Sequence, residues 1–217
     1  RDADSAMYRA KGRGAGQYEI FNPSMHAFSV KMLPMEAELR RAIERDELVL
    51  HYQPIISLRK DRVYGLEALV RWQHPSGKMI SPAEFLPVAE ASGLMFTIIN
   101  QLLRQAAAKL RHWQHEQPRC WPLSVTINIS PKDFAREDHL SHILDTLMRL
   151  KMQAHGIRLE ITESQLMEDT AAANRALSMI ADTGTRVYID DFGTGYSSLS
   201  YLANFTDRKS TRLNSSH

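Results

Sequence analysis

Apolar positions follow two different periods along this chain. Alternation of apolar and polar residues predicts strands over residues 48–58, 63–72, 123–130, 157–163 and 186–191. Apolar residues spaced three and four apart predict helices over residues 35–45, 82–91, 97–115, 138–152 and 170–182. Strand and helix therefore alternate through at least three units, which predicts an α/β fold built as a (β/α) barrel.

The predicted strand over residues 63–72 carries two opposite charges on one face. Its period places Gly65, Glu67, Leu69 and Arg71 on the same side. An acid or an arginine alone in a core is costly, so the two charges need each other or a ligand. The pattern leaves open an internal salt bridge and a binding site.

The later strands carry polar side chains at equivalent positions. Asn128, Glu160 and Asp190 each lie on the polar face of a strand, near its C-terminal end. Because these ends meet at one mouth of a (β/α) barrel, we expect them to converge with Glu67. Oxygen ligands without His or Cys favour Mg²⁺ or Mn²⁺ over zinc. Any one of the four, taken alone, is also compatible with a hydrogen-bonded polar residue of the core.

The segment from Tyr188 to Leu199 combines two adjacent acidic residues with a glycine-containing loop. Asp190 and Asp191 are adjacent at the end of an apolar strand, and their charges repel unless a cation or a proton relieves them. Gly193 and Gly195 allow the next loop to fold back and present N–H groups to an anion. The segment therefore suggests a metal and a phosphate, and the alternative is a helix N-cap followed by an ordinary turn.

The composition of the chain argues against a membrane-spanning or disulfide-bonded protein. No apolar run approaches the roughly 20 residues of a membrane-spanning helix, and no signal-like N-terminus is present. The single cysteine, Cys120, forms no internal disulfide, which fits a reducing cytoplasm. We therefore expect a cytoplasmic segment, with membrane anchoring of a longer parent left open.

Both ends of the chain look cut. Residue 1 is Arg, so we expect an upstream part. Residues 207–217 form a polar string that matches the in-frame translation of a common sequencing adapter, and we expect a non-native tail there; a disordered tail is the alternative. The tail contains three basic residues and one acidic residue, a net charge of +2, which equals the formal net charge of the whole chain. The rest of the chain is therefore neutral, and its charge gives no evidence for a nucleic-acid partner.

Six motifs occur in order between residues 35 and 205. They are Tyr52-Gln-Pro-Ile55, Glu67-Ala-Leu69 within Gly65 to Trp72, Pro82-Ala-Glu-Phe-Leu-Pro87, Asn128-Ile-Ser130, Glu160-Ile-Thr-Glu-Ser164 and Asp190-Asp-Phe-Gly-Thr-Gly-Tyr-Ser-Ser-Leu199. In these motifs the chain resembles the EAL domains, which hydrolyse the bacterial messenger cyclic di-GMP. The resemblance implies a modified (β/α)₈ (TIM-like) barrel, here incomplete and truncated after about the fifth strand.

The resemblance also implies roles for individual residues. The family's metal ligands, for two Mg²⁺ or Mn²⁺ ions, correspond to Glu67, Asn128, Glu160, Asp190 and Asp191. It further implies that Arg71 contacts a substrate phosphate, that Gln53 lines the site, and that Glu163 steadies the loop after Asp191. The implied activity is metal-dependent hydrolysis of cyclic di-GMP to linear pGpG, in a homodimer formed through the EAL domain.

The first 21 residues resemble another family. Ala3-Asp-Ser-Ala-Met-Tyr-Arg-Ala-Lys11 and the glycines after it are similar to the C-terminus of GGDEF (diguanylate cyclase) domains. We therefore expect a GGDEF remnant over residues 1–21, a linker over 22–34, the N-terminal portion of an EAL domain over 35–206 and the tail over 207–217.

Some parts of the EAL pattern follow the present end of the chain. The family's catalytic lysine and a further metal-binding glutamate are among them, so we expect this fragment to be inactive and its intact parent to be a phosphodiesterase. Two rivals remain open. One is a non-catalytic receptor for cyclic di-GMP or a protein-interaction module of EAL type, and the other is an unrelated (β/α) metal enzyme acting on another phosphate ester.

Overall fold

The computed structural model describes residues 23–57, 61–116, 123–152, 156–190 and 211–213. The chain divides into two compact units, Arg1–Val49 with Val70–Ile98 and Leu50–Leu69 with Ile99–His217. The predictions for residues 1–22, which include the GGDEF resemblance, lie outside the described residues.

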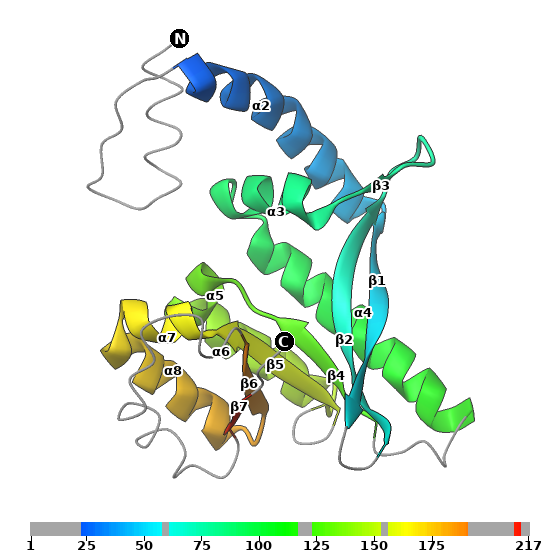
Figure 1. The fold of residues 1–217 in the computed structure, drawn as a ribbon, viewed down its shortest axis with the longest axis vertical. Helices are drawn as coiled ribbons and strands as arrows, with labels where there is room; N and C mark the ends of the chain where they lie inside the picture. Colours follow the sequence, from blue (N-terminus) through cyan, green and yellow to red (C-terminus); the bar gives the residue numbers. More distant parts are fainter. Residues whose placement is uncertain (1–22, 58–60, 117–122, 153–155, 191–210, 214–217) are drawn as a thin grey trace. The chain divides into compact units, whose positions relative to one another are not determined.

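The second unit is built around a parallel sheet. β2 (Arg62–Gln73) pairs with β4 (Val125–Asn128), which pairs with β5 (Ile157–Thr162) and then β6 (Arg186–Asp190), all in parallel. The sheet order is β1-β2-β4-β5-β6-β7, with β1 spanning Leu48–Ser57 and β7 Thr211–Leu213. Figure 1 shows β4, β5 and β6 side by side, with α6 and α8 alongside them.

Helices cover one face of this sheet. α4 (Met95–Glu116), α6 (Glu137–Arg149) and α8 (Thr170–Asp182) contribute apolar side chains to one core cluster with the strands. Val125, Ile127, Ile157, Leu159, Val187 and Ile189 supply the strands' share of that core. These are the alternate apolar positions of the sequence pattern, so the polar positions between them lie on the opposite face, here called the inner face.

The first unit surrounds Trp72, at the end of β2. The indole is fully buried, packs edge-to-face on Phe85 with ring centroids 5.8 Å apart, and donates from Nε1 to Glu47 Oε2 at 3.1 Å. α2 (Pro23–Glu44), β3 (Met79–Ile80) and α3 (Pro82–Ala91) complete this unit. α3 begins where its signals predict, because Ser81 precedes Pro82 at the first helical position.

Several elements differ from the sequence-based expectation. α2 begins at Pro23 rather than at residue 35, so residues 23–34, predicted to be linker, are helical. Two short helices, α5 (Pro131–Ala135) and α7 (Glu163–Glu168), follow β4 and β5 directly. In α5, Ser130 Oγ accepts the Asp133 backbone N–H at 3.2 Å, so the residues expected to form a turn form a capped helical turn.

Residues 211–213, which lie within the segment expected to be a non-native tail, form a short strand; the origin of that segment stays a prediction. Thr211–Leu213 pairs in parallel with β6, with Ile189 opposite Leu213. β7 therefore covers an edge of β6 that the sequence-based reading left unpaired. None of the helices that the structure describes combines the length and apolar character needed to cross a membrane.

Candidate active site

The inner face of the sheet carries polar side chains near the C-terminal ends of β4, β5 and β6 and, in Glu67, near the middle of β2. In register, Glu67 lies opposite Thr126, Asn128 opposite Glu160, and Thr162 opposite Asp190. Partners in a parallel pair point to the same face, so Glu67, Asn128, Glu160 and Asp190 all belong to the inner face.

The structure brings Glu67 and Asn128 into direct contact. Asn128 Nδ2 donates to Glu67 Oε1 at 3.1 Å, between side chains 61 residues apart in the sequence. Donation by the amide nitrogen leaves Asn128 Oδ1 as the acceptor of that side chain. The pair therefore offers carboxylate and amide oxygens together.

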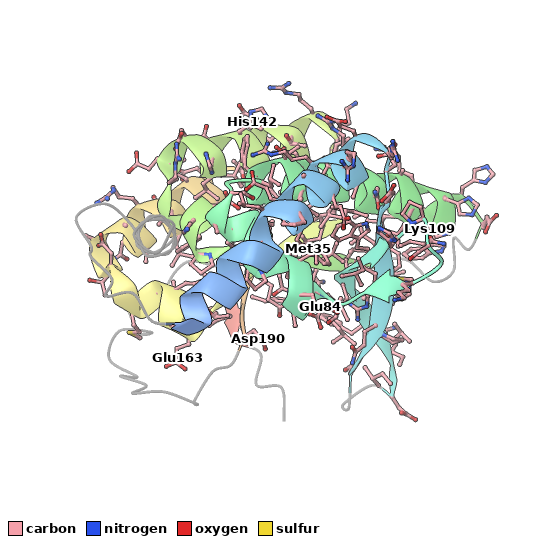
Figure 2. All side chains as sticks on the ribbon, turned by 90° about the horizontal axis from the view of Figure 1, so that it is seen from above. Met35, Glu84, Lys109, His142, Glu163 and Asp190 are labelled. Atoms are coloured by element: carbon pink, nitrogen blue, oxygen red, sulfur yellow. The ribbon has the colours of Figure 1, made fainter. Side chains whose placement is uncertain are left out.

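Glu160 lies next to this pair, since it is the register partner of Asn128 on β5. It is only 3% exposed, and its other register partner is Tyr188 of β6. Asp190 is two residues beyond Tyr188, is half-buried and ends β6. Figure 2 labels Asp190 and Glu163, the latter in the first turn of α7. Asp191, Gly193 and Gly195 lie outside the described residues.

The donor chemistry fits a hard divalent cation. Among the described residues, no group of three or more His, Cys, Asp or Glu side chains is close enough to hold a metal ion. The amide oxygen of Asn128 is a further possible ligand, and Asp191 lies outside the described residues. The Glu67–Asn128 contact beside a buried Glu160 gives the oxygen-only set that Mg²⁺ or Mn²⁺ prefers.

The other predicted site residues, Gln53, Arg71 and Glu163, form no hydrogen bond or ion pair with Glu67 or Asn128 among the described residues. Gln53 is exposed on β1, at a position that alternates with Leu50 and Tyr52, which pack against the core. Arg71 belongs to the first unit, where its Nη1 donates to the Val70 carbonyl oxygen at 2.8 Å. Glu163 is 6% exposed at the start of α7.

Arg158 and Tyr188 of the inner face, together with Tyr64, were not selected from the sequence as site residues. Arg158, two residues before Glu160, lies with its guanidinium carbon 4.6 Å from the Tyr64 ring centroid and 4.9 Å from that of Tyr188. The signal for Arg158 was present, because the period of its strand places it on the face of Glu160.

A family model, described as the EAL domain, matches residues 36–206. The chain belongs to the EAL domain family. EAL phosphodiesterases are in general dependent on a divalent metal.

Curated relatives are similar to this EAL chain over most of its length. It is 39% identical over 201 residues to the bifunctional diguanylate cyclase/cyclic di-GMP phosphodiesterase MucR of Pseudomonas aeruginosa, covering 93% of this chain and 29% of that protein. It is 38% identical over 205 residues to the cyclic di-GMP phosphodiesterase PdeR of Escherichia coli, covering 94% and 30%. The chain thus spans under a third of the length of either curated relative.

A solved structure has the same fold. The MucR phosphodiesterase in complex with cyclic di-GMP superposes with a TM-score of 0.73 at 36% identity, covering 83% of this chain and 71% of that one. The α/β EAL architecture predicted from the motifs is therefore confirmed.

Proposed function

We propose that the protein containing this EAL domain hydrolyses cyclic di-GMP to linear pGpG with the aid of a divalent cation. The observation that carries the proposal is the contact between Glu67 and Asn128, with buried Glu160 beside it on the next strand. Relatives named cyclic di-GMP phosphodiesterases, at 38–39% identity, support the choice of substrate.

The proposed ligands of the cation are the inner-face oxygens. Glu67, Asn128, Glu160 and Asp190 would hold it, together with Asp191. When bound, Mg²⁺ or Mn²⁺ lowers the pKa of a water and stabilises negative charge on phosphodiester oxygens. The strand register supports this ligand set, because Asn128 lies opposite Glu160, and Asp190 opposite Thr162, near the carboxyl ends of parallel strands.

Other side chains would bind and orient the dinucleotide. Arg71 supplies a permanent positive charge for a non-bridging phosphate oxygen, and Gln53 lines the site with an amide. Glu163, buried at the start of α7, would steady the loop that follows Asp191. We further propose, on the resemblance alone, that two copies associate through the EAL domain.

The test uses the full-length natural protein that carries these residues. Purified protein is incubated with cyclic di-GMP and Mg²⁺ or Mn²⁺, and pGpG is quantified by chromatography. We expect turnover that EDTA abolishes and that Glu160→Gln lowers by at least about a hundredfold. Glu137→Gln is the matched control, because Glu137 is exposed on α6 and pairs only with the surface residue Arg175 among the ion pairs described.

Two results would contradict the hydrolase. Turnover that is unchanged by EDTA and by Glu160→Gln would remove the proposed site from the reaction. Binding of cyclic di-GMP with no pGpG formed under either metal would favour the receptor alternative instead.

A further inference from the structure

A side chain replaces one rung of the hydrogen-bond ladder between β4 and β5, just beyond Asn128 and Glu160. These two residues are register partners, and the Ile129 backbone N–H donates to the Glu160 carbonyl oxygen at 2.9 Å. In a parallel pair, the next bond would run from the Thr162 N–H to the Ile129 carbonyl oxygen. Both of these groups bond the side-chain amide of Gln165 instead.

The amide of Gln165 uses its two ends on two different strands. Its Nε2 donates to the Ile129 carbonyl oxygen at 3.0 Å, and its Oε1 accepts the Thr162 N–H at 2.9 Å. Only one orientation of the amide satisfies both bonds, because the carbonyl oxygen requires a donor and the N–H requires an acceptor. Gln165 is 8% exposed, so water does not compete freely for either bond. The amide, here called the Gln165 bridge, thus takes the place of a peptide group between the strands.

Helix capping accounts for only one of these two bonds. Gln165 is the third residue of α7, and its bond to the Thr162 N–H is half of a capping box. A capping box involves no other element of the fold. The bond to Ile129 spans 36 residues of sequence and joins α7 to the end of β4. The Gln165 bridge therefore fixes the ends of β4 and β5 and the first turn of α7 to one another.

The Gln165 bridge adjoins two of the proposed metal ligands. Asn128 directly precedes Ile129, and Glu160 comes two residues before Thr162. The positions of these two ligands therefore depend on the backbone at the strand ends that the bridge connects. In metal sites, groups that orient the ligands without touching the metal contribute substantially to its affinity.

We propose that Gln165 is a positioning residue, whose amide holds the ends of β4 and β5 at the separation at which Asn128 and Glu160 bind one divalent cation. That the amide holds the strand ends is independent of the proposed function, whereas its service to a cation rests on that function. Loss of the amide therefore loosens the two strand ends and weakens metal binding, although Gln165 is not itself a ligand.

The first arm of the test measures hydrogen exchange by mass spectrometry in the full-length natural protein, in EDTA. Gln165→Met keeps the approximate size of the side chain and removes both hydrogen-bonding groups. We expect backbone exchange at Ile129 and Thr162 to be at least about tenfold faster in this variant. Unchanged exchange at both positions would show that the amide does not hold the strand ends, and would overturn the proposal.

Thr146→Val is the matched control for the loss of a buried hydrogen bond. Thr146 Oγ1 donates to Asn100 Oδ1 at 3.1 Å, and this bond joins α6 to α4. We expect the control to lose stability to urea, as Gln165→Met does, without faster exchange at Ile129 or Thr162. Equal acceleration in both variants would indicate general destabilisation and would overturn the proposal.

The second arm measures binding of Mn²⁺ alone by calorimetry. We expect Gln165→Met to bind Mn²⁺ about tenfold more weakly than the parent protein, and Thr146→Val to bind it as the parent does. A purely structural role of Gln165 would lower stability and leave the Mn²⁺ affinity unchanged, which would overturn the proposal. A parent protein that binds no Mn²⁺ would contradict the proposed function, whereas hydrogen exchange would still decide whether Gln165 holds the strand ends.

A milder variant keeps both arms decisive if Gln165→Met does not fold. Gln165→Asn supplies the same amide on a side chain one methylene shorter, which is too short to reach both partners. We expect faster exchange at Ile129 and Thr162 and a loss of Mn²⁺ affinity of about threefold, as for one weakened hydrogen bond. Exchange and affinity like those of the parent protein would overturn the proposal.

Discussion

At the scale of single residues, the contact between Asn128 and Glu67 is the most informative feature. The Asn128 amide donates to the Glu67 carboxylate at 3.1 Å. A second carboxylate at position 128 would instead repel Glu67. The same amide presents an oxygen that suits a hard cation. On the proposed function, Asn128 therefore stabilises the metal-free chain and also supplies an oxygen ligand to the cation.

Asn128→Asp tests this account. Substitution of the donor by a carboxylate places two like charges in contact, so we expect the metal-free free energy of unfolding to fall by about 1–3 kcal/mol. Thermal unfolding in EDTA and in Mg²⁺ measures it, and Mg²⁺ is expected to restore part of the loss. Asn174→Asp, at an exposed asparagine of α8, is the control; an equal loss in both variants would contradict the prediction.

The pH dependence of stability contains a contribution from Tyr52. Its ring packs on Trp113 with centroids 4.8 Å apart, and burial raises the pKa of the Tyr52 hydroxyl to about 12. The folded chain thus holds the phenolic proton more tightly than the unfolded chain, whose Tyr pKa is about 10. This contribution is complete below about pH 10 and is lost as the pH rises toward 12.

Tyr52→Phe removes this titration and keeps the ring. We expect the melting temperature of the parent chain to fall more steeply between pH 9 and about 11.5 than that of the variant. Parallel curves for the two proteins would show that Tyr52 ionisation is not linked to folding.

At the scale of elements, helix caps determine where the helices begin. Asp169 accepts from the backbone N–H groups of Ala171 at 3.0 Å and Ala172 at 2.9 Å, at the start of α8. We expect Asp169→Ala to lower the free energy of unfolding by about 1 kcal/mol. Asp182→Ala, at the opposite end of α8, is the control and is expected to be neutral or slightly stabilising, because an acid there opposes the helix dipole.

Cap signals also explain which elements the sequence predicts well. α3 and α8 have the predicted bounds, because Ser81 with Pro82 and Asp169 mark their starts. The start of α2 was missed because Pro34 usually interrupts a helix, whereas α2 continues through it. The pairing of β7 with β6 was also missed, since three residues carry no readable period.

At the scale of the whole molecule, the period of each strand predicted that the polar side chains lie on one face. The barrel expectation then predicted that these strands are neighbours, and the register of β4, β5 and β6 agrees. The contact of Tyr64 with Arg158 was not predictable, because the period places Tyr64 on the face opposite Gly65. Such contacts depend on how strands pair, which one sequence does not specify.

The central claim is that the inner-face oxygens of this EAL domain bind a divalent cation. Its most direct test is a crystal structure of the natural protein with Mn²⁺ and cyclic di-GMP, with data collected for the anomalous signal of manganese. The account predicts an anomalous peak within about 2.0–2.6 Å of oxygens from at least three of Glu67, Asn128, Glu160 and Asp190. A manganese peak elsewhere, or full occupancy by cyclic di-GMP with no peak at these residues, would contradict it.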